Sequence, residues 1–110
     1  MLPGMSPRIP LDHYRISEFC RRWKVTEMAL FGSVLRDDFR TGSDVDVLVS
    51  FSPDARWSLW DLSTMREELR EIFGRDVDLV EKKALRNPFR RHEILTTKQV
   101  IYVADPTEVS

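Results

Sequence analysis

The sequence has a single cysteine and therefore no means of cross-linking itself. Cys20 has no second cysteine to pair with, so a disulfide framework and a cysteine-based metal cluster are both excluded. Cys20 continues the apolar stripe of a predicted helix, which favours a packed thiol over a reactive one. A chain without disulfides is typical of the cytoplasm, and a cytoplasmic location is what we expect.

The chain also lacks a long apolar run and a strong net charge. Its N-terminus, MLPGMSPRIP, is interrupted by prolines and resembles neither a signal peptide nor a membrane span, so we expect no membrane association. A formal net charge of -1 provides no general attraction to nucleic acid. We therefore expect no direct nucleic-acid binding, because such binding would have to come from local patches of charge.

The length of 110 residues allows one small domain. We expect a loose leader over residues 1–10, the folded domain over 11–104 and an unpatterned tail over 105–110. Helical and strand periodicities alternate along the domain, which predicts an α/β (α+β) fold with helices packed on one sheet of about four strands. The predicted helices are Asp12–Trp23, Ser33–Phe39, one from Ser58 to Gly74 and one starting at Asn87-Pro88; the predicted strands are Asp44–Phe51, Val25–Phe31, Arg75–Glu81 and Gln99–Val103.

Two aspartates share one face of a predicted strand. Alternation places Val45, Val47, Val49 and Phe51 on one side and Asp44, Asp46, Leu48 and Ser50 on the other, which predicts a sheet with one covered face and one open face. The Cα atoms of Asp44 and Asp46 would lie about 7 Å apart, where two charges repel by roughly 2 to 3 kcal/mol at an effective dielectric near 20. Asp78 lies in a strand well placed to pair beside them. Such a cluster either faces solvent on an open sheet or holds a divalent cation.

The surrounding residues restrict the kind of ligand. An EF-hand is excluded because Leu48 falls where an oxygen ligand is needed, and carboxylates without His or Cys favour Mg²⁺ or Mn²⁺. Gly32-Ser33 lies where a strand passes into a helix, a position suited to cradling phosphate, although a purely structural turn is the alternative. The turn is not a Walker A loop, because no second glycine followed by lysine is present. Together these parts suit phosphoryl or nucleotidyl transfer.

At these residues the sequence resembles the minimal nucleotidyltransferase (MNT) group of the DNA polymerase beta-like nucleotidyltransferase superfamily. The signature of that group is Gly-Ser, ten residues and Asp-x-Asp; here Gly32-Ser33 is followed by the ten residues Val34–Ser43 and then by Asp44-Val45-Asp46. Arg75–Val80 is similar to the strand that carries the third carboxylate. The resemblance implies a nucleotidyltransferase palm with a mixed sheet.

The resemblance also implies roles for these residues. Asp44 and Asp46 become ligands of two catalytic Mg²⁺ ions, with Mn²⁺ as the alternative, and Asp78 a third ligand near the attacking hydroxyl. Gly32 and Ser33 would hold the phosphates of ATP. Arg36 would reach a phosphate, pair with Asp37 or Asp38, or brace the sheet. The group further implies an antitoxin that transfers AMP from ATP to a tyrosine of a helical HEPN-type ribonuclease toxin, with which it forms a hetero-oligomer.

Two other functions stay open at this point. The chain could be a binding-only antitoxin that masks its toxin, or a small-molecule (antibiotic) nucleotidyltransferase with a separate acceptor-binding subunit. The segment Lys82–Lys98 carries a local charge of +5, which fits either a solvated face or a patch that meets a partner or the triphosphate. Trp57 and Trp60 are expected to pack, whereas an exposed pair would indicate a protein contact surface.

Overall fold

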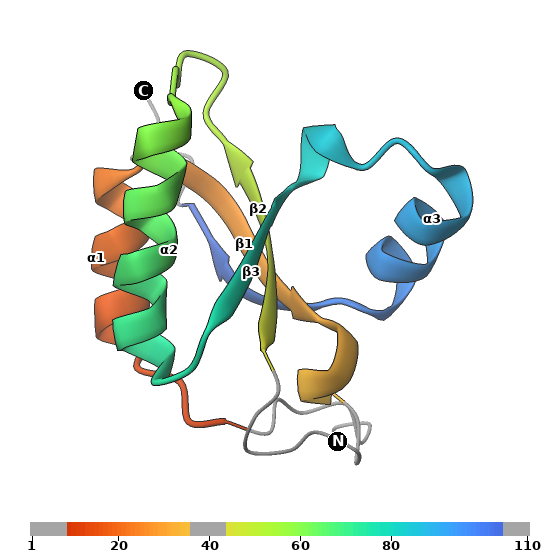
Figure 1. Ribbon diagram of the computed structural model, residues 1–110, viewed down its shortest axis with the longest axis horizontal. Helices are drawn as coiled ribbons and strands as arrows, with labels where there is room; N and C mark the ends of the chain where they lie inside the picture. Colours follow the sequence, from red (N-terminus) through yellow and green to blue (C-terminus); the bar gives the residue numbers. More distant parts are fainter. Residues whose placement is uncertain (1–8, 36–43, 105–110) are drawn as a thin grey trace.

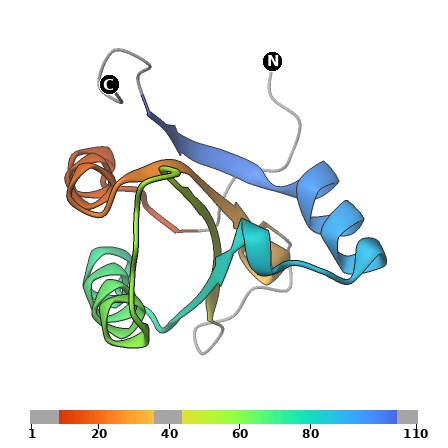
Figure 2. The ribbon, with the colours of Figure 1, turned by 90° about the horizontal axis from the view of Figure 1, so that it is seen from above.

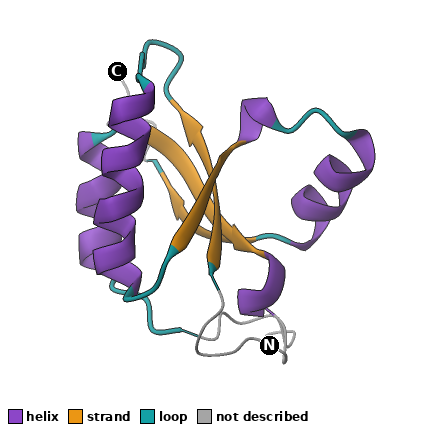
Figure 3. Ribbon diagram, in the orientation of Figure 1, coloured by secondary structure: helices purple, strands orange, loops and turns teal. Residues whose placement is uncertain are grey.

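The fold is one mixed sheet between two unequal layers of helix (Figures 1 and 3). The structure is a computed structural model that describes residues 9–35 and 44–104. Strand order is β3-β2-β1-β4, with β2 and β3 parallel and the other neighbours antiparallel, which confirms the predicted mixed α/β fold. The elements are α1 (His13–Arg22), β1 (Val25–Phe31), the 3-10 turn η1 (Gly32–Leu35), β2 (Val45–Phe51), α2 (Leu59–Phe73), β3 (Val77–Glu81), the 3-10 turn η2 (Lys82–Ala84), α3 (Pro88–Thr97) and β4 (Gln99–Val103).

Local capping chemistry fixes where the helices begin and end. Asp12 accepts from the backbone N–H of Arg15 at 3.1 Å and starts α1. Ser58 and Asp61 form the reciprocal capping box that was predicted for α2. Gly74 ends α2 in the left-handed conformation, at φ +73°. Because these signals are local, the sequence alone predicts both ends of α2.

One face of the sheet carries the main core. Helices α1 and α2 lie side by side on this face, as the view in Figure 2 shows. Cys20 is fully buried there, so the predicted packed thiol is confirmed, and burial raises the pKa of this thiol to about 12. The large side chains of this cluster that are buried most completely are Ile16, Phe19, Met28, Leu30, Met65 and Leu69.

The opposite face is covered at its centre, which the predicted alternation did not anticipate. Leu48 was assigned to the same open, polar side as the aspartates, yet it is only 3% exposed. It packs with Ala29 and Phe31 of the sheet and with Leu85 and Ile94, which η2 and α3 bring over this face. The prediction of one uncovered face is therefore wrong at Leu48, because a short helix with a weak apolar pattern covers it.

The structure also differs from the prediction at a short helix and at the N-terminal leader. The predicted helix Ser33–Phe39 is a single 3-10 turn over Gly32–Leu35, and its remainder lies outside the described residues. Ile9, inside the predicted loose leader, is 7% exposed and packs in the main core. The domain limits themselves remain a prediction. Within the described ranges, no helix is both long enough and apolar enough to cross a membrane.

The two tryptophans of the β2–α2 region behave differently. Trp57 packs as predicted, with ring centroids 5.1 Å from Trp23 and 6.4 Å from Phe51. Trp60, in the first turn of α2, is 84% exposed and does not pack as predicted. The pair is therefore split between the core and the surface.

Candidate active site

The parallel pairing of β2 with β3 brings two of the predicted carboxylates together. Asp46 and Asp78 are direct partners in the register, and paired residues of neighbouring strands project from the same face, with their strands about 4.8 Å apart. The backbone N–H of Val45 donates to the carbonyl oxygen of Asp76 at 2.9 Å, which holds the beginnings of both strands side by side. The predicted proximity of the third carboxylate to the Asp-x-Asp strand is thus present in the fold.

Gly32 lies directly against the Asp46 side chain. Phe31 at the end of β1 is the register partner of Asp46, so the next residue turns at the level of the carboxylate. Gly32 has φ +75°, and a Cβ built there would overlap Asp46 Oδ2 and approach Cγ to 3.2 Å. The backbone conformation therefore favours glycine at this position, and any other side chain would have to displace the Asp46 carboxylate. The Gly-Ser turn and the Asp-x-Asp motif, which ten residues separate in the sequence, form one site.

The remaining predicted residues are placed less fully. Asp44 is exposed and precedes β2 by one residue, while Ser33 follows Gly32 within η1. Arg36 lies outside the described residues. The structure thus brings Gly32, Asp46 and Asp78 together at the beginnings of β2 and β3. Asp44 lies two residues before Asp46 in the chain.

The donor chemistry of this site fits a hard cation bound together with a substrate. Considering only the residues that the structure describes, no group of three His, Cys, Asp or Glu side chains converges to enclose a metal ion. Mg²⁺ does not require such a cage, because it is usually held by one or two carboxylates, water and substrate phosphates. Asp46 and Asp78, facing the same way from adjacent strands, suit that incomplete coordination.

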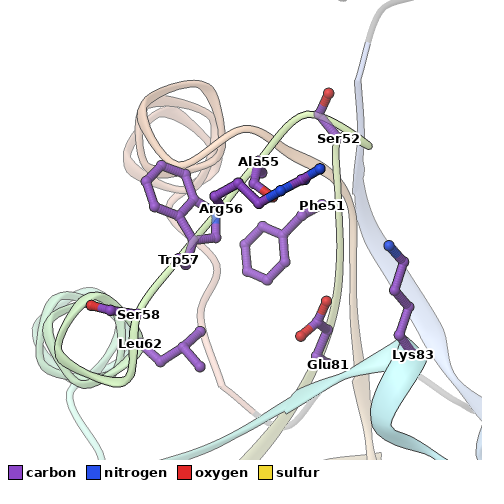
Figure 4. A pocket seen from close by; sticks show the side chains of 9 residues that line it. All are labelled: Phe51, Ser52, Ala55, Arg56, Trp57, Ser58, Leu62, Glu81 and Lys83. Carbon is purple, nitrogen blue, oxygen red and sulfur yellow. The ribbon is translucent and has the colours of Figure 1, made fainter.

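A pocket that the sequence did not reveal lies at the other ends of the same strands. Its volume is about 440 Å³, and Figure 4 shows Phe51 at its centre between Trp57 and Lys83. Phe51 lies five residues beyond Asp46 on β2, roughly 17 Å away along the strand. This pocket is therefore separate from the paired aspartates. Its residues come from β2, the loop after it, α2, β3 and η2, which are far apart in the sequence. The only signal of this site in the sequence was the run of basic residues that begins at Lys82.

The contact of a glycine turn with one aspartate of an Asp-x-Asp strand, beside a parallel strand bearing a third aspartate, defines a nucleotidyltransferase palm. Residues 15–101 match the family described as "Nucleotidyltransferase domain". The chain belongs to this family, and its enzyme class is nucleotidyltransferase. The resemblance noted from Gly32-Ser33 and Asp44-Val45-Asp46 is confirmed.

Known relatives and structures resemble the chain over most of its length. Protein adenylyltransferase MntA of Thermococcus cleftensis is 34% identical over 86 residues, which are 78% of this chain and 82% of the relative. A toxin–antitoxin crystal structure with AMP-PNP superposes with a TM-score of 0.67 at 19% identity, covering 89% of this chain and 78% of that one. The complex of tri-AMPylated Shewanella oneidensis HEPN toxin with MNT antitoxin gives a TM-score of 0.60 at 19% identity, covering 88% and 76%. At these identities the two structures establish a common fold.

Proposed function

We propose that this nucleotidyltransferase moves AMP from ATP to a hydroxyl group of a partner protein and thereby acts as an antitoxin. The observation that carries the proposal is the contact between Gly32 and the Asp46 carboxylate, with Asp78 next to Asp46. A turn that presents backbone N–H groups beside paired carboxylates suits a substrate with both phosphates and a bound divalent cation.

The reaction needs the residues of this site in distinct roles. Asp44 and Asp46 would hold Mg²⁺, or Mn²⁺ as the alternative, and two such ions would supply positive charge to neutralise the phosphates of ATP. Gly32 and Ser33, with Arg36 as a further candidate, position those phosphates. Asp78 lies near the attacking hydroxyl and accepts its proton. The hydroxyl oxygen bonds to the α-phosphorus, the bond from that phosphorus to the bridging oxygen breaks, and pyrophosphate leaves.

The acceptor in this proposal is a tyrosine of a HEPN-type toxin. Support comes from the name of the Thermococcus relative, a protein adenylyltransferase, and from the AMPylated toxin in the Shewanella complex. Adding AMP places a bulky anionic group on the toxin, which can block an active site that must bind an anionic polymer. The proposed assembly is a hetero-oligomer of the two proteins.

The test is an intact-mass measurement on the toxin encoded by the neighbouring reading frame. The toxin is incubated with this protein, ATP and Mg²⁺, and we expect it to gain the mass of one or more AMP groups. The gain should disappear with EDTA and return with excess Mg²⁺. The variant Asp44→Asn/Asp46→Asn should transfer none, whereas Glu71→Gln, which removes a carboxylate from the exposed side of α2, should transfer normally.

Three outcomes would contradict the proposal in different ways. A toxin that stays inhibited without any gain in mass would leave masking by binding as the function. A gain that persists in Asp44→Asn/Asp46→Asn would retain the activity and refute the assignment of the metal ligands. Modification of a small hydroxylated molecule, with the toxin unchanged, would favour the small-molecule enzyme.

A further inference from the structure

Basic side chains gather at the ends of β2 and β3 that lie away from the paired aspartates. Two adjoining pockets, of about 440 and 230 Å³, share Phe51, Glu81 and Lys83 in their walls. We call this combined depression the basic groove. Its charged side chains are four cations and one carboxylate: Arg56, Lys82, Lys83, Arg91 and Glu81.

The cations of the basic groove form no ion pair with a carboxylate of residues 9–35 or 44–104, unlike several cations elsewhere in the molecule. Arg22 pairs with Glu68 at 2.9 Å, Lys24 with Asp54 at 3.2 Å and Lys98 with Glu27 at 2.7 Å. By contrast, the ammonium groups of Lys82 and Lys83 make no ion pair or hydrogen bond with any residue of 9–35 or 44–104.

The two arginines of the groove are held by neutral groups. Arg56 donates to the carbonyl oxygens of Pro53 and Ala55, both at 2.9 Å. Arg91 donates to the carbonyl oxygens of Lys82 and Leu85 at 3.2 and 3.4 Å. These bonds fix the positions of the guanidinium groups without cancelling their charge. The groove is therefore a preformed positive site that suits an anionic ligand.

Apolar surface accompanies the charge. Phe51, Trp57 and Leu62 contribute to the wall of the larger pocket. The first turn of α2 begins after Ser58 of that wall and presents Leu59 and Trp60, which are 83% and 84% exposed. Exposed leucine and tryptophan beside a concave charged surface are typical of a protein contact. A ligand that used the whole surface would combine carboxylates with apolar side chains.

The position of the groove separates it from the reacting phosphates. Phe51 is roughly 17 Å from Asp46 along β2, and Glu81 is roughly 10 Å from Asp78 along β3. A lysine at this end would have to reach back along the sheet to contact a phosphate held between Gly32 and Asp46. The anion that the groove suits is therefore a second group, remote from the chemistry.

We propose that the basic groove docks an acidic segment of the partner toxin whose apolar side chains pack on Leu59 and Trp60. This inference rests on the proposed function for the identity of the partner. The groove would hold the toxin while its acceptor hydroxyl reaches the aspartates at the other ends of β2 and β3. Charges at such a site increase the rate and strength of association without entering the chemical step.

Steady-state kinetics of AMP transfer with varied toxin concentration test this docking role. We expect Lys83→Glu to raise the KM for the toxin by about tenfold and to leave kcat and the KM for ATP unchanged. Lys82→Glu/Lys83→Glu should raise it further, Trp60→Ala should also raise it, and Lys83→Arg should retain the wild-type value. Arg15→Glu is the control for charge reversal, because Arg15 is exposed on α1, and its guanidinium has no partner among the described residues.

Direct binding measurements separate this inference from the proposed function. If Asp44→Asn/Asp46→Asn binds the toxin as tightly as wild type while Lys83→Glu binds weakly, the groove is the docking site whether or not AMP is transferred. If AMP is transferred but Lys83→Glu and Lys82→Glu/Lys83→Glu keep the wild-type KM, the docking role is refuted and the proposed function stands. No binding of the toxin by wild type would overturn both. Loss of affinity for an RNA oligonucleotide in these variants, at an unchanged KM for the toxin, would also overturn the docking role.

Discussion

The two ends of the β2–β3 pair carry opposite charge and differ in how they are built. At the beginnings of the strands lie Asp44, Asp46, Asp76 and Asp78, and at their ends lies the basic groove. At the acidic end the backbone of Gly32 lies so close to Asp46 that a Cβ at this position would displace the carboxylate. The basic end is an open depression whose lysines have no partner among the described residues. A tight, negative end suits chemistry on a metal-bound nucleotide, and an open, positive end suits recognition of a partner.

Removing a carboxylate at the acidic end should have the largest effect. We expect Asp46→Asn to lower kcat for AMP transfer by about 10³-fold or more, because a metal ligand contributes several kcal/mol to transition-state stabilisation. The affinity for the toxin, measured by calorimetry, should not change, since Asp46 is remote from the basic groove. Equal loss of transfer and of toxin affinity would contradict the separation of the two ends.

The face of the sheet that carries the aspartates should be sensitive to truncation at its covered centre. Leu48→Ala should lower the free energy of unfolding by about 2 to 4 kcal/mol, because the side chain is buried beneath η2 and α3. Chemical denaturation measures this change. Leu59→Ala removes the same atoms from an 83% exposed site and should change stability by less than about 0.5 kcal/mol. A Leu48→Ala protein as stable as Leu59→Ala would mean that this face is open, as the simple alternation predicts.

The close contact at the acidic end can be tested by comparing two glycines of nearly equal φ. Gly32→Ala and Gly74→Ala both force alanine into the left-handed region, at φ +75° and +73°, which costs about 1 to 2 kcal/mol of stability in each case. Only at Gly32 does the new Cβ meet the Asp46 carboxylate, whereas nothing lies within 4 Å of it at Gly74.

Activity should therefore distinguish the two variants where stability does not. Gly32→Ala should reduce kcat by about 10²-fold, which is typical of a displaced catalytic group, and Gly74→Ala should leave kcat unchanged. Initial rates below the unfolding temperature of both variants provide the measurement. Similar kcat values in the two variants would show that the Gly32 contact does not position Asp46.

Local signals made much of this fold predictable. The bounds of β1 and β4 agree with the sequence pattern, and Ser58 and Gly74 mark the ends of α2, because alternation and capping depend on near neighbours in the chain. The pairing of Asp46 with Asp78 could be anticipated, since both lie on predicted strands that a helix connects. Their roles in metal binding remain a prediction.

Features that depend on distant residues could not be predicted. Leu48 is buried by Leu85 and Ile94, which belong to segments with too little apolar periodicity to indicate which face they cover. The basic run was visible in the sequence, but not that Lys98 pairs with Glu27 while Lys82 and Lys83 stay unpaired within the described residues. Likewise, the sequence predicted a turn at Gly32 but not its contact with Asp46, which depends on the register of β1 with β2.

One experiment compares the two ends of the β2–β3 pair directly: initial rates of AMP transfer over a range of toxin concentrations, for wild type, Asp46→Asn and Lys83→Glu in parallel. We predict that Asp46→Asn lowers kcat and keeps the toxin affinity of wild type, and that Lys83→Glu raises the KM for the toxin and keeps kcat. The same kinetic parameter changing in both variants, or Asp46→Asn transferring AMP at the wild-type rate, would contradict the division between a catalytic end and a docking end.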